Sequence, residues 1–445
     1  MRRRLGPPTG IFLAVLLASP AARAGESSSP GEPDAVRLGP VGLVPHAEVR
    51  GRFEGRSDLD LDRSDAEDPN RFLLRTRIGA ALSWGVASAF VEGVDARELM
   101  TPPADRRDEA TLDVHEAWAE LRRPFGTPFF ARIGRQELSL GSKRLVDCSG
   151  WGNRLRAFDM LRLGADGERW RVDAFAGRVV VVRDGELDRW KAGESFWGFF
   201  STLGLGFGAS VDLFVFGLNR QARGDEAKPI TGEDGVVGAA SKTTPGLRLF
   251  GSALSKRLDY EAEVAVQFGN RANDRVFAYA GRAGARWTQR DLPGAPWLGF
   301  ELNHASGDEY PNDGQFGRFD PLFGSTRGPY GLIDLFRWQN MSEAGLFFGL
   351  SPGDTVTLTA EYHAFWIASV KDAWFTSSGA VLRRAEDGEA PSFAGKELDL
   401  LVRWRPLGVL GFEAGVAWFV PGRFARATGA ANAARALYVQ AALSY

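Results

Sequence analysis

The sequence has one cysteine, four histidines and no long hydrophobic run beyond its N-terminal segment. Cys148 has no partner for an internal disulfide bond, so we expect a fold that does not depend on disulfides. A transmembrane helix needs about 20 consecutive apolar residues, and no later segment is that long. These absences exclude a helical inner-membrane protein. They do not exclude a membrane β-barrel, because its strands are apolar on one face only.

Motifs of common enzymes and metal sites are also weak. The one G-x-S-x-G, at 349–353, falls on a short turn between two predicted strands, whereas the nucleophile elbow of the hydrolases joins a strand to a helix, so we expect no elbow here. The histidines form no HxH or HxxxH pair; they are His46, His115, His304 and His363. We therefore expect no catalytic activity, no histidine metal site and no cofactor. The one alternative is Ca²⁺ at an acidic turn, where Asp308, Asn312 and Asp313 offer the oxygen donors that calcium takes.

Lysine is rare in this chain, and no block of basic residues is present. Of the 54 basic residues, seven are lysines and 47 are arginines, while the formal net charge is −2 at pH 7. The lack of a basic patch argues against a nucleic-acid partner. Arginine can pair with a carboxylate through two parallel hydrogen bonds, so its abundance directs attention to carboxylated partners.

The N-terminus has the three parts of a secretory signal peptide. Arg2, Arg3 and Arg4 form a positive segment, the short apolar stretch 11–17 follows, and Ala-Arg-Ala at 22–24 is a small-x-small cleavage motif. We expect residues 1–24 to be the signal peptide. A Ser/Pro/Gly-rich leader at 25–42 and one domain at 43–445 then follow.

Alternation of apolar and polar residues recurs along the rest of the chain, whereas helical periodicity is almost absent. In the segment DYEAEVAVQF, Tyr260 and Val264 share one face of a strand, and Glu261 and Glu263 share the other. The final segment ALYVQAALSY alternates in the same way up to Tyr445. Alternation alone fits either a soluble β-sandwich or a membrane β-barrel.

Connection lengths favour the barrel. Short turns alternate along the chain with longer polar segments, at about 56–71, 96–111, 136–154, 181–194, 219–242, 303–339, 369–395 and 421–435. Short turns at one end and long loops at the other are typical of outer-membrane barrels. The pattern therefore predicts an all-β, transmembrane, antiparallel up-and-down β-barrel of about 18 strands. Its outward face would contact outer-membrane lipid.

The polar faces of these strands would line the lumen. Many of their residues are arginines, such as Arg75 and Arg77, but carboxylates such as Glu261 and Glu301 lie on the same face. Two interpretations stay open. The arginines can attract anions into a channel, or they can brace the barrel by pairing with the lumenal carboxylates.

Two segments resemble the signatures of a known family. The first is RIGRQELSLGSKRLVDCSGWGNRLRAFDMLRLG, at 132–164, with its G-R-Q-E-L, R-L-V, W-x-N and R-x-F-D motifs. The second is HASGDEYPNDGQFGRFDPLFGSTRGPYGLIDLFRWQNM, at 304–341. Both are similar to the alginate export family of Gram-negative outer-membrane barrels. The resemblance covers about 70 residues in these two blocks.

The resemblance implies a monomeric barrel of 18 strands in the outer membrane, acting as a passive channel. It also implies an arginine-lined constriction that selects uronate polymers, with possible periplasmic export partners. By motif match, the candidate selectivity residues are Arg75, Arg77, Arg135, Arg156, Asp159 and Arg337. The substrate would be an anionic polysaccharide or a carboxylated solute. The alternatives are a general or small-solute porin and, from another class, a surface adhesin or a barrel enzyme.

Overall fold

The computed structural model describes residues 36–64, 70–183, 186–222, 229–325 and 327–445. The predicted signal peptide, 1–24, and the first part of the predicted leader lie outside these residues. The described chain begins with β1 (Val36–Leu38), which pairs with the start of the first long strand, β2 (Val41–Ser57). No helix in the described residues has the length and apolar character needed to cross a membrane.

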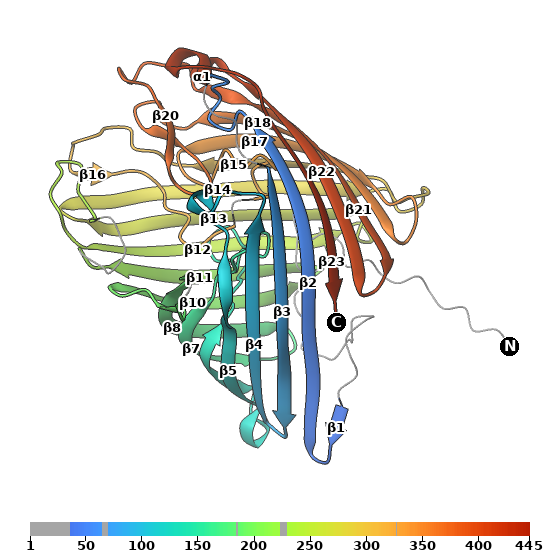
Figure 1. Ribbon diagram of the computed structural model, residues 1–445. Helices are drawn as coiled ribbons and strands as arrows, with labels where there is room; N and C mark the ends of the chain where they lie inside the picture. The colour runs from blue at the N-terminus through green and yellow to red at the C-terminus, as the bar shows by residue number, and fades with distance from the viewer. Residues whose placement is uncertain (1–35, 65–69, 184–185, 223–228, 326) are drawn as a thin grey trace.

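The described strands form one closed antiparallel barrel of 18 strands (Figure 1). The first nine are β2, β3 (Arg71–Trp84), β4 (Ala87–Leu99), β5 (Ala110–Arg122), β6 (Phe129–Gln136), β7 (Phe158–Asp166), β8 (Trp170–Val181), β10 (Glu194–Gly206) and β11 (Ala209–Arg220). The other nine are β12 (Ala240–Ala253), β13 (Leu258–Arg271), β14 (Asp274–Thr288), β15 (Trp297–Ala305), β17 (Met341–Leu350), β18 (Val356–Ile367), β21 (Phe393–Leu407), β22 (Leu410–Pro421) and β23 (Ala434–Ser444). The predicted fold class and strand number are confirmed.

The last strand closes the barrel on the first. β23 pairs with β2 from Glu48 opposite Ser444 to Ser57 opposite Arg435. The backbone amide of Tyr445 donates to the carbonyl of Ala47 at 2.8 Å, so the pairing extends to the final residue. A strand edge in lipid would leave peptide groups without hydrogen bonds, and closure removes that edge.

Shorter elements lie in the connections between the barrel strands. They are β9 (Arg189–Trp190), β16 (Gln315–Phe316), β19 (Ala373–Phe375), β20 (Val381–Arg384), the helix α1 (Arg423–Thr428), and 3-10 turns at Pro103–Asp105 and Pro124–Gly126. Apart from the tight connection between β13 and β14, the long connections all lie at one end of the barrel, and the short turns lie at the other. The predicted alternation of connections is confirmed.

The barrel strands have an apolar outer face and bury polar side chains on the inner face, where β8, β10 and β11 also bury phenylalanines. On β21, Leu398 and Leu400 are each 43% exposed, whereas the residues that alternate with them, Glu397 and Asp399, are 0% exposed. Successive side chains of a strand point to opposite faces, so one strand supplies both surfaces. The exposed leucines belong to the face that meets lipid in a barrel of this type.

Two long loops fold into the barrel and pack there. The loop at 137–157 meets the loop at 306–340 where Val146 bridges Phe323. The second loop also lies against the inner wall, since the amide of Ile333 donates to the Glu397 carboxylate at 2.8 Å. Within it Phe336 stacks on Phe365 of β18, with ring centroids 3.9 Å apart. The lumen is therefore partly filled by an apolar core of loop residues, which strand alternation did not predict.

A charge placed on the outer face tests which residues meet lipid. Leu400 lies midway along β21, whereas Leu407 lies at its end. We expect Leu400→Arg to lower the free energy of unfolding by about 2–4 kcal/mol, and Leu407→Arg by about 0–1 kcal/mol, because the cost depends on depth in the bilayer. Urea unfolding in liposomes, followed by tryptophan fluorescence, measures both. Equal effects of the two substitutions would contradict this placement.

Candidate functional site

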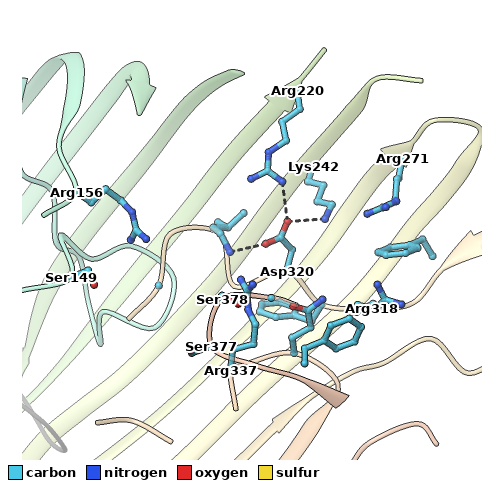
Figure 2. A pocket seen from close by; sticks show the side chains of 17 residues that line it. Ser149, Arg156, Arg220, Lys242, Arg271, Arg318, Asp320, Arg337, Ser377 and Ser378 are labelled. Atoms are coloured by element: carbon cyan, nitrogen blue, oxygen red, sulfur yellow. Dashed lines mark hydrogen bonds and ion pairs between the residues drawn. The ribbon is translucent and has the colours of Figure 1, made fainter. Parts of the chain in front are cut away.

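A cavity of about 570 Å³ lies inside the barrel near its long-loop end (Figure 2). We call it the cationic cavity, because most of its charged lining residues are basic. It is bounded by the ends of β11, β12 and β13, by the two inward loops and by the loop at 368–392. Its charged lining residues are Arg156, Arg220, Lys242, Arg271, Arg318, Asp320 and Arg337. Six cations and one carboxylate therefore face the same space.

The single lining carboxylate is bound by two of these cations. Figure 2 shows Arg220 and Lys242 directed at Asp320, with Lys242 Nζ 2.9 Å and Arg220 Nη1 3.6 Å from its Oδ2 atom. Arg220 is also paired with its cross-strand partner on β10, Glu194, to which its Nε donates at 2.6 Å. Ion pairing thus fixes the side of the cavity formed by β11 and β12.

Three lining arginines have no carboxylate partner within the described residues. Arg156 donates only to backbone carbonyl oxygens, those of Asp147 at 2.7 Å and of Phe323. Arg271 donates from Nε to the carbonyl of Thr231 at 2.9 Å. No ion pair in the described part of the chain involves Arg337, and its buried Nε atom has no hydrogen-bond partner there. These guanidinium groups keep donors for a ligand, since each has five N–H bonds.

The charges of the cavity persist at neutral pH. Burial of the Asp320 carboxyl opposes its ionisation and by itself would raise its pKa. The cations around it, Lys242, Arg220 and Arg337, outweigh burial, so its pKa lies below the ordinary value. Burial lowers the pKa of Arg156 and of Arg337, but a guanidinium group remains protonated in proteins. The cavity therefore combines several fixed positive charges with one fixed negative charge.

The absence of a side chain at Gly379 makes room for the guanidinium group of Arg337. A Cβ atom at this position would lie 2.2 Å from Nη1 of Arg337. The residue also has a φ of +83°, a region that side chains with a Cβ rarely adopt. A side chain at position 379 would displace Arg337 from the wall of the cavity.

The motif arginines of β3 lie elsewhere and are paired. Arg75 Nε donates to Glu48 at 2.8 Å, and its Nη1 donates to the carbonyl of Gly152 at 2.8 Å. Arg77 Nε donates to Glu92 at 2.6 Å. These contacts hold the loop at 137–157 and neighbouring strands together. They correspond to the bracing interpretation of the lumenal arginines.

Arg135 and Asp159 form another such pair, between β6 and β7. The two residues are direct cross-strand partners, and Arg135 Nε donates to Asp159 Oδ1 at 2.9 Å. Arg135 also donates to the carbonyls of Val114 and Asp188. A role of these two residues in selectivity stays a prediction.

Of the predicted site residues, the structure brings Arg156 and Arg337 together at the cationic cavity. Sequence reasoning missed the other four lining cations, Arg220, Lys242, Arg271 and Arg318. Arg220 and Lys242 stand near strand ends on either side of a long loop, Arg271 ends β13 beside a tight connection, and Arg318 is in the second motif block. That position was the only available signal, because their convergence depends on how the loops fold inward.

The residues named for calcium lie on the loop at 306–340. The amide of Asn312 donates to Glu233, and the carboxylate of Asp313 accepts from the amide of Gln315 two residues later. Asp308 is buried, and its amide donates to Asp372. Calcium binding at these residues stays a prediction.

Comparison with known proteins identifies the family. The model of the family described as "Alginate export" matches residues 45–439, almost the whole of the barrel. The chain belongs to the alginate export family. The resemblance seen in the two motif blocks is thereby confirmed over nearly the whole chain. No curated protein matches this member of the family.

Solved structures similar to this family member include two proteins of Pseudomonas aeruginosa. OccK11 (OpdR) has a TM-score of 0.57 at 12% identity and covers 91% of this chain and 96% of its own. OccD3 (OpdP) has a TM-score of 0.59 at 10% identity, covering 93% and 92%. At such identities the likeness shows the fold alone. With the family match, it makes this protein an outer-membrane β-barrel channel of a Gram-negative bacterium.

Removing the one carboxylate from the cationic cavity tests its electrostatics. We expect Asp320→Asn to shift the reversal potential in a salt gradient toward anion selectivity, because the cations it neutralised then act on the permeating ion. Planar bilayer recording measures the shift. Asp291→Asn is the matched control, since that carboxylate pairs with Arg257 at a short turn. A reversal potential unchanged by Asp320→Asn would show that ions do not pass through this cavity.

Proposed function

We propose that this protein is a passive channel for an anionic polysaccharide of the uronate type, working as a monomer and without a catalytic step. The observation that carries the proposal is the cationic cavity, where six cations and one carboxylate share about 570 Å³. Membership of the alginate export family supports the substrate class.

The three arginines without carboxylate partners, Arg156, Arg271 and Arg337, supply the recognition. Every uronate unit carries one carboxylate, and a guanidinium fork binds a carboxylate through two hydrogen bonds. The surrounding low-dielectric wall focuses the field of these charges into the lumen. Fixed cations would attract the polymer at each repeat. Because several cations can each bind a carboxylate, the polymer can move along the lumen as its carboxylates pass from one cation to the next.

The size of the cavity sets how much of a polymer it holds. Its volume falls within the roughly 300–1,000 Å³ of sites that enclose a drug-sized ligand. A few sugar units would fit at one time, in an extended strand threaded along the lumen. Short turns of outer-membrane barrels face the periplasm, so the polymer would enter at that end and meet the cationic cavity before leaving. A periplasmic export partner would deliver it.

A porin for small carboxylated solutes is the second candidate. The packed loops at 137–157 and 306–340 favour it, because they fill part of the lumen with buried apolar side chains such as Phe336 and Trp338. A narrow route would pass a small carboxylate more easily than a polymer. The two candidates differ in how block of the channel depends on the length of the blocking chain.

Block by oligouronates tests the proposal. We expect oligouronates to block single-channel current in planar bilayers, with affinity that rises with chain length. Arg337→Gln and Arg156→Gln should each weaken block by about 10-fold or more, since a hydrogen bond to a charged group contributes about 1.5–3 kcal/mol. Arg257→Gln is the control, because this residue lies at a short turn and pairs with Asp291.

Other outcomes separate the candidates. Block by monomeric uronate as strong as block by longer chains would favour the small-solute porin. Block that none of the cavity substitutions changes would overturn recognition at the cationic cavity. Neutral oligosaccharides of equal length serve as the reference for block that depends on size alone.

A further inference from the structure

A buried histidine lies among carboxylates on the inner wall, away from the cationic cavity. Glu361 and His363 are on β18, and Glu361 is the direct cross-strand partner of Asp399 on β21. Glu397, on the same strand, is opposite His363. Glu343 on the preceding strand β17 completes the group. All five side chains point inward, and none is more than 5% exposed.

One ring nitrogen of His363 has a hydrogen-bond partner, and the other has none among the described residues. Nδ1 lies 2.5 Å from Glu343 Oε1, so this carboxylate accepts the Nδ1 proton. In the neutral ring with its proton on Nδ1, the Nε2 atom carries the lone pair. It is buried without a hydrogen-bond partner in the described residues, and it faces Glu361 Oε2 and Asp399 Oδ2, each 3.7 Å away. That distance is too long for a hydrogen bond.

The spacing fits ligand atoms around one ion. Zinc binds nitrogen and oxygen ligands at about 2.0–2.2 Å, which places two such ligands roughly 3.4 Å apart in a tetrahedral site. The 3.7 Å from His363 Nε2 to each of the two oxygens is close to this separation, and the three ligand atoms lie within 4.8 Å of one another. Carboxylate support of the opposite ring nitrogen, as Glu343 gives here, is the usual arrangement behind a metal-bound histidine.

The charge of the cluster favours a cation. Within the described residues, the ion pairs of Glu343, Glu361 and Asp399 are all to His363. The surroundings are dry, because the imidazole lies beside the rings of Phe347 and Phe365. Four carboxylates near a single imidazole in such a place are costly unless a positive charge compensates them.

We propose that Glu361, His363 and Asp399 bind a divalent transition-metal ion such as Zn²⁺, with Glu343 as the residue that positions His363. An imidazole with two carboxylates suits zinc, whereas calcium takes oxygen ligands. Three protein ligands leave a fourth position, which water can fill. The proposal does not depend on which substrate the channel carries.

The ion would fasten the inward loop to the barrel wall. Asp399 Oδ2 accepts a hydrogen bond from the amide of Leu332 at 3.0 Å, and Glu397 accepts one from Ile333 at 2.8 Å. A carboxylate oxygen has lone pairs for both an amide and an ion. The same loop carries Asp320 and Arg337 of the cationic cavity. Metal at β18 and β21 would therefore stabilise the loop that shapes the lumen.

The test uses the full barrel, purified in detergent and stripped of metal with a chelator. We expect about one Zn²⁺ per chain by elemental analysis after dialysis, a visible Co²⁺ absorption spectrum of low coordination number, and no competition by Ca²⁺. Loading with Zn²⁺ should raise the temperature at which the folded form is lost on a heat-modifiability gel. A wild-type chain that retains no Zn²⁺ and gives no Co²⁺ spectrum would overturn the proposal.

Substitutions assign the ligands. His363→Gln and Glu361→Gln should each weaken Zn²⁺ binding by at least about 10-fold, and Glu343→Gln should weaken it by about 10- to 100-fold while the Co²⁺ spectrum remains. His304→Gln is the matched control, because His304 bonds to Ser342 on the outer side of the wall. If one ligand variant does not fold, the other decides. Wild-type affinity in the folded ligand variants would place the ion elsewhere and refute the site.

Discussion

The interior of this barrel depends on pairing buried charges. Alternation forces one side chain in two to point inward, and the inward loops then cut many of these side chains off from water. Arg282 shows the result, since it contacts Glu261, Glu263 and Glu301 from neighbouring strands while its side chain is 2% exposed. Removing one member of such a group would leave an uncompensated buried charge.

Within the described residues, both proposed sites lie where this pairing is incomplete. At the cationic cavity, Arg156, Arg271 and Arg337 lack carboxylate partners, so positive charge is left over. At the His363 cluster, carboxylates outnumber the imidazole, so negative charge is left over. The first excess suits an anionic substrate, and the second suits a metal cation. Both excesses border the loop at 306–340, so the proposed recognition site and the proposed metal site share one structural element.

The sequence was most informative where local rules apply. Period-two alternation and the order of short and long connections were enough to predict an antiparallel barrel of about 18 strands, and the motif blocks indicated the family. The motifs were less informative about roles. Arg75, Arg77 and Arg135 stand in matching positions, yet in the structure each is bound to a carboxylate, whereas Arg220 and Lys242 line the cavity without belonging to any motif.

The sequence by itself determined the strands and their faces, because these follow from the spacing of side chains along a single strand. Only the tertiary structure decided which charges remain unpaired. Glu361 and Asp399 are 38 positions apart in the chain but are cross-strand partners on the adjacent strands β18 and β21. Arg156 and Arg337 line the same cavity only because two loops fold inward. Such sites depend on strand register and loop packing, which are set by contacts between distant segments.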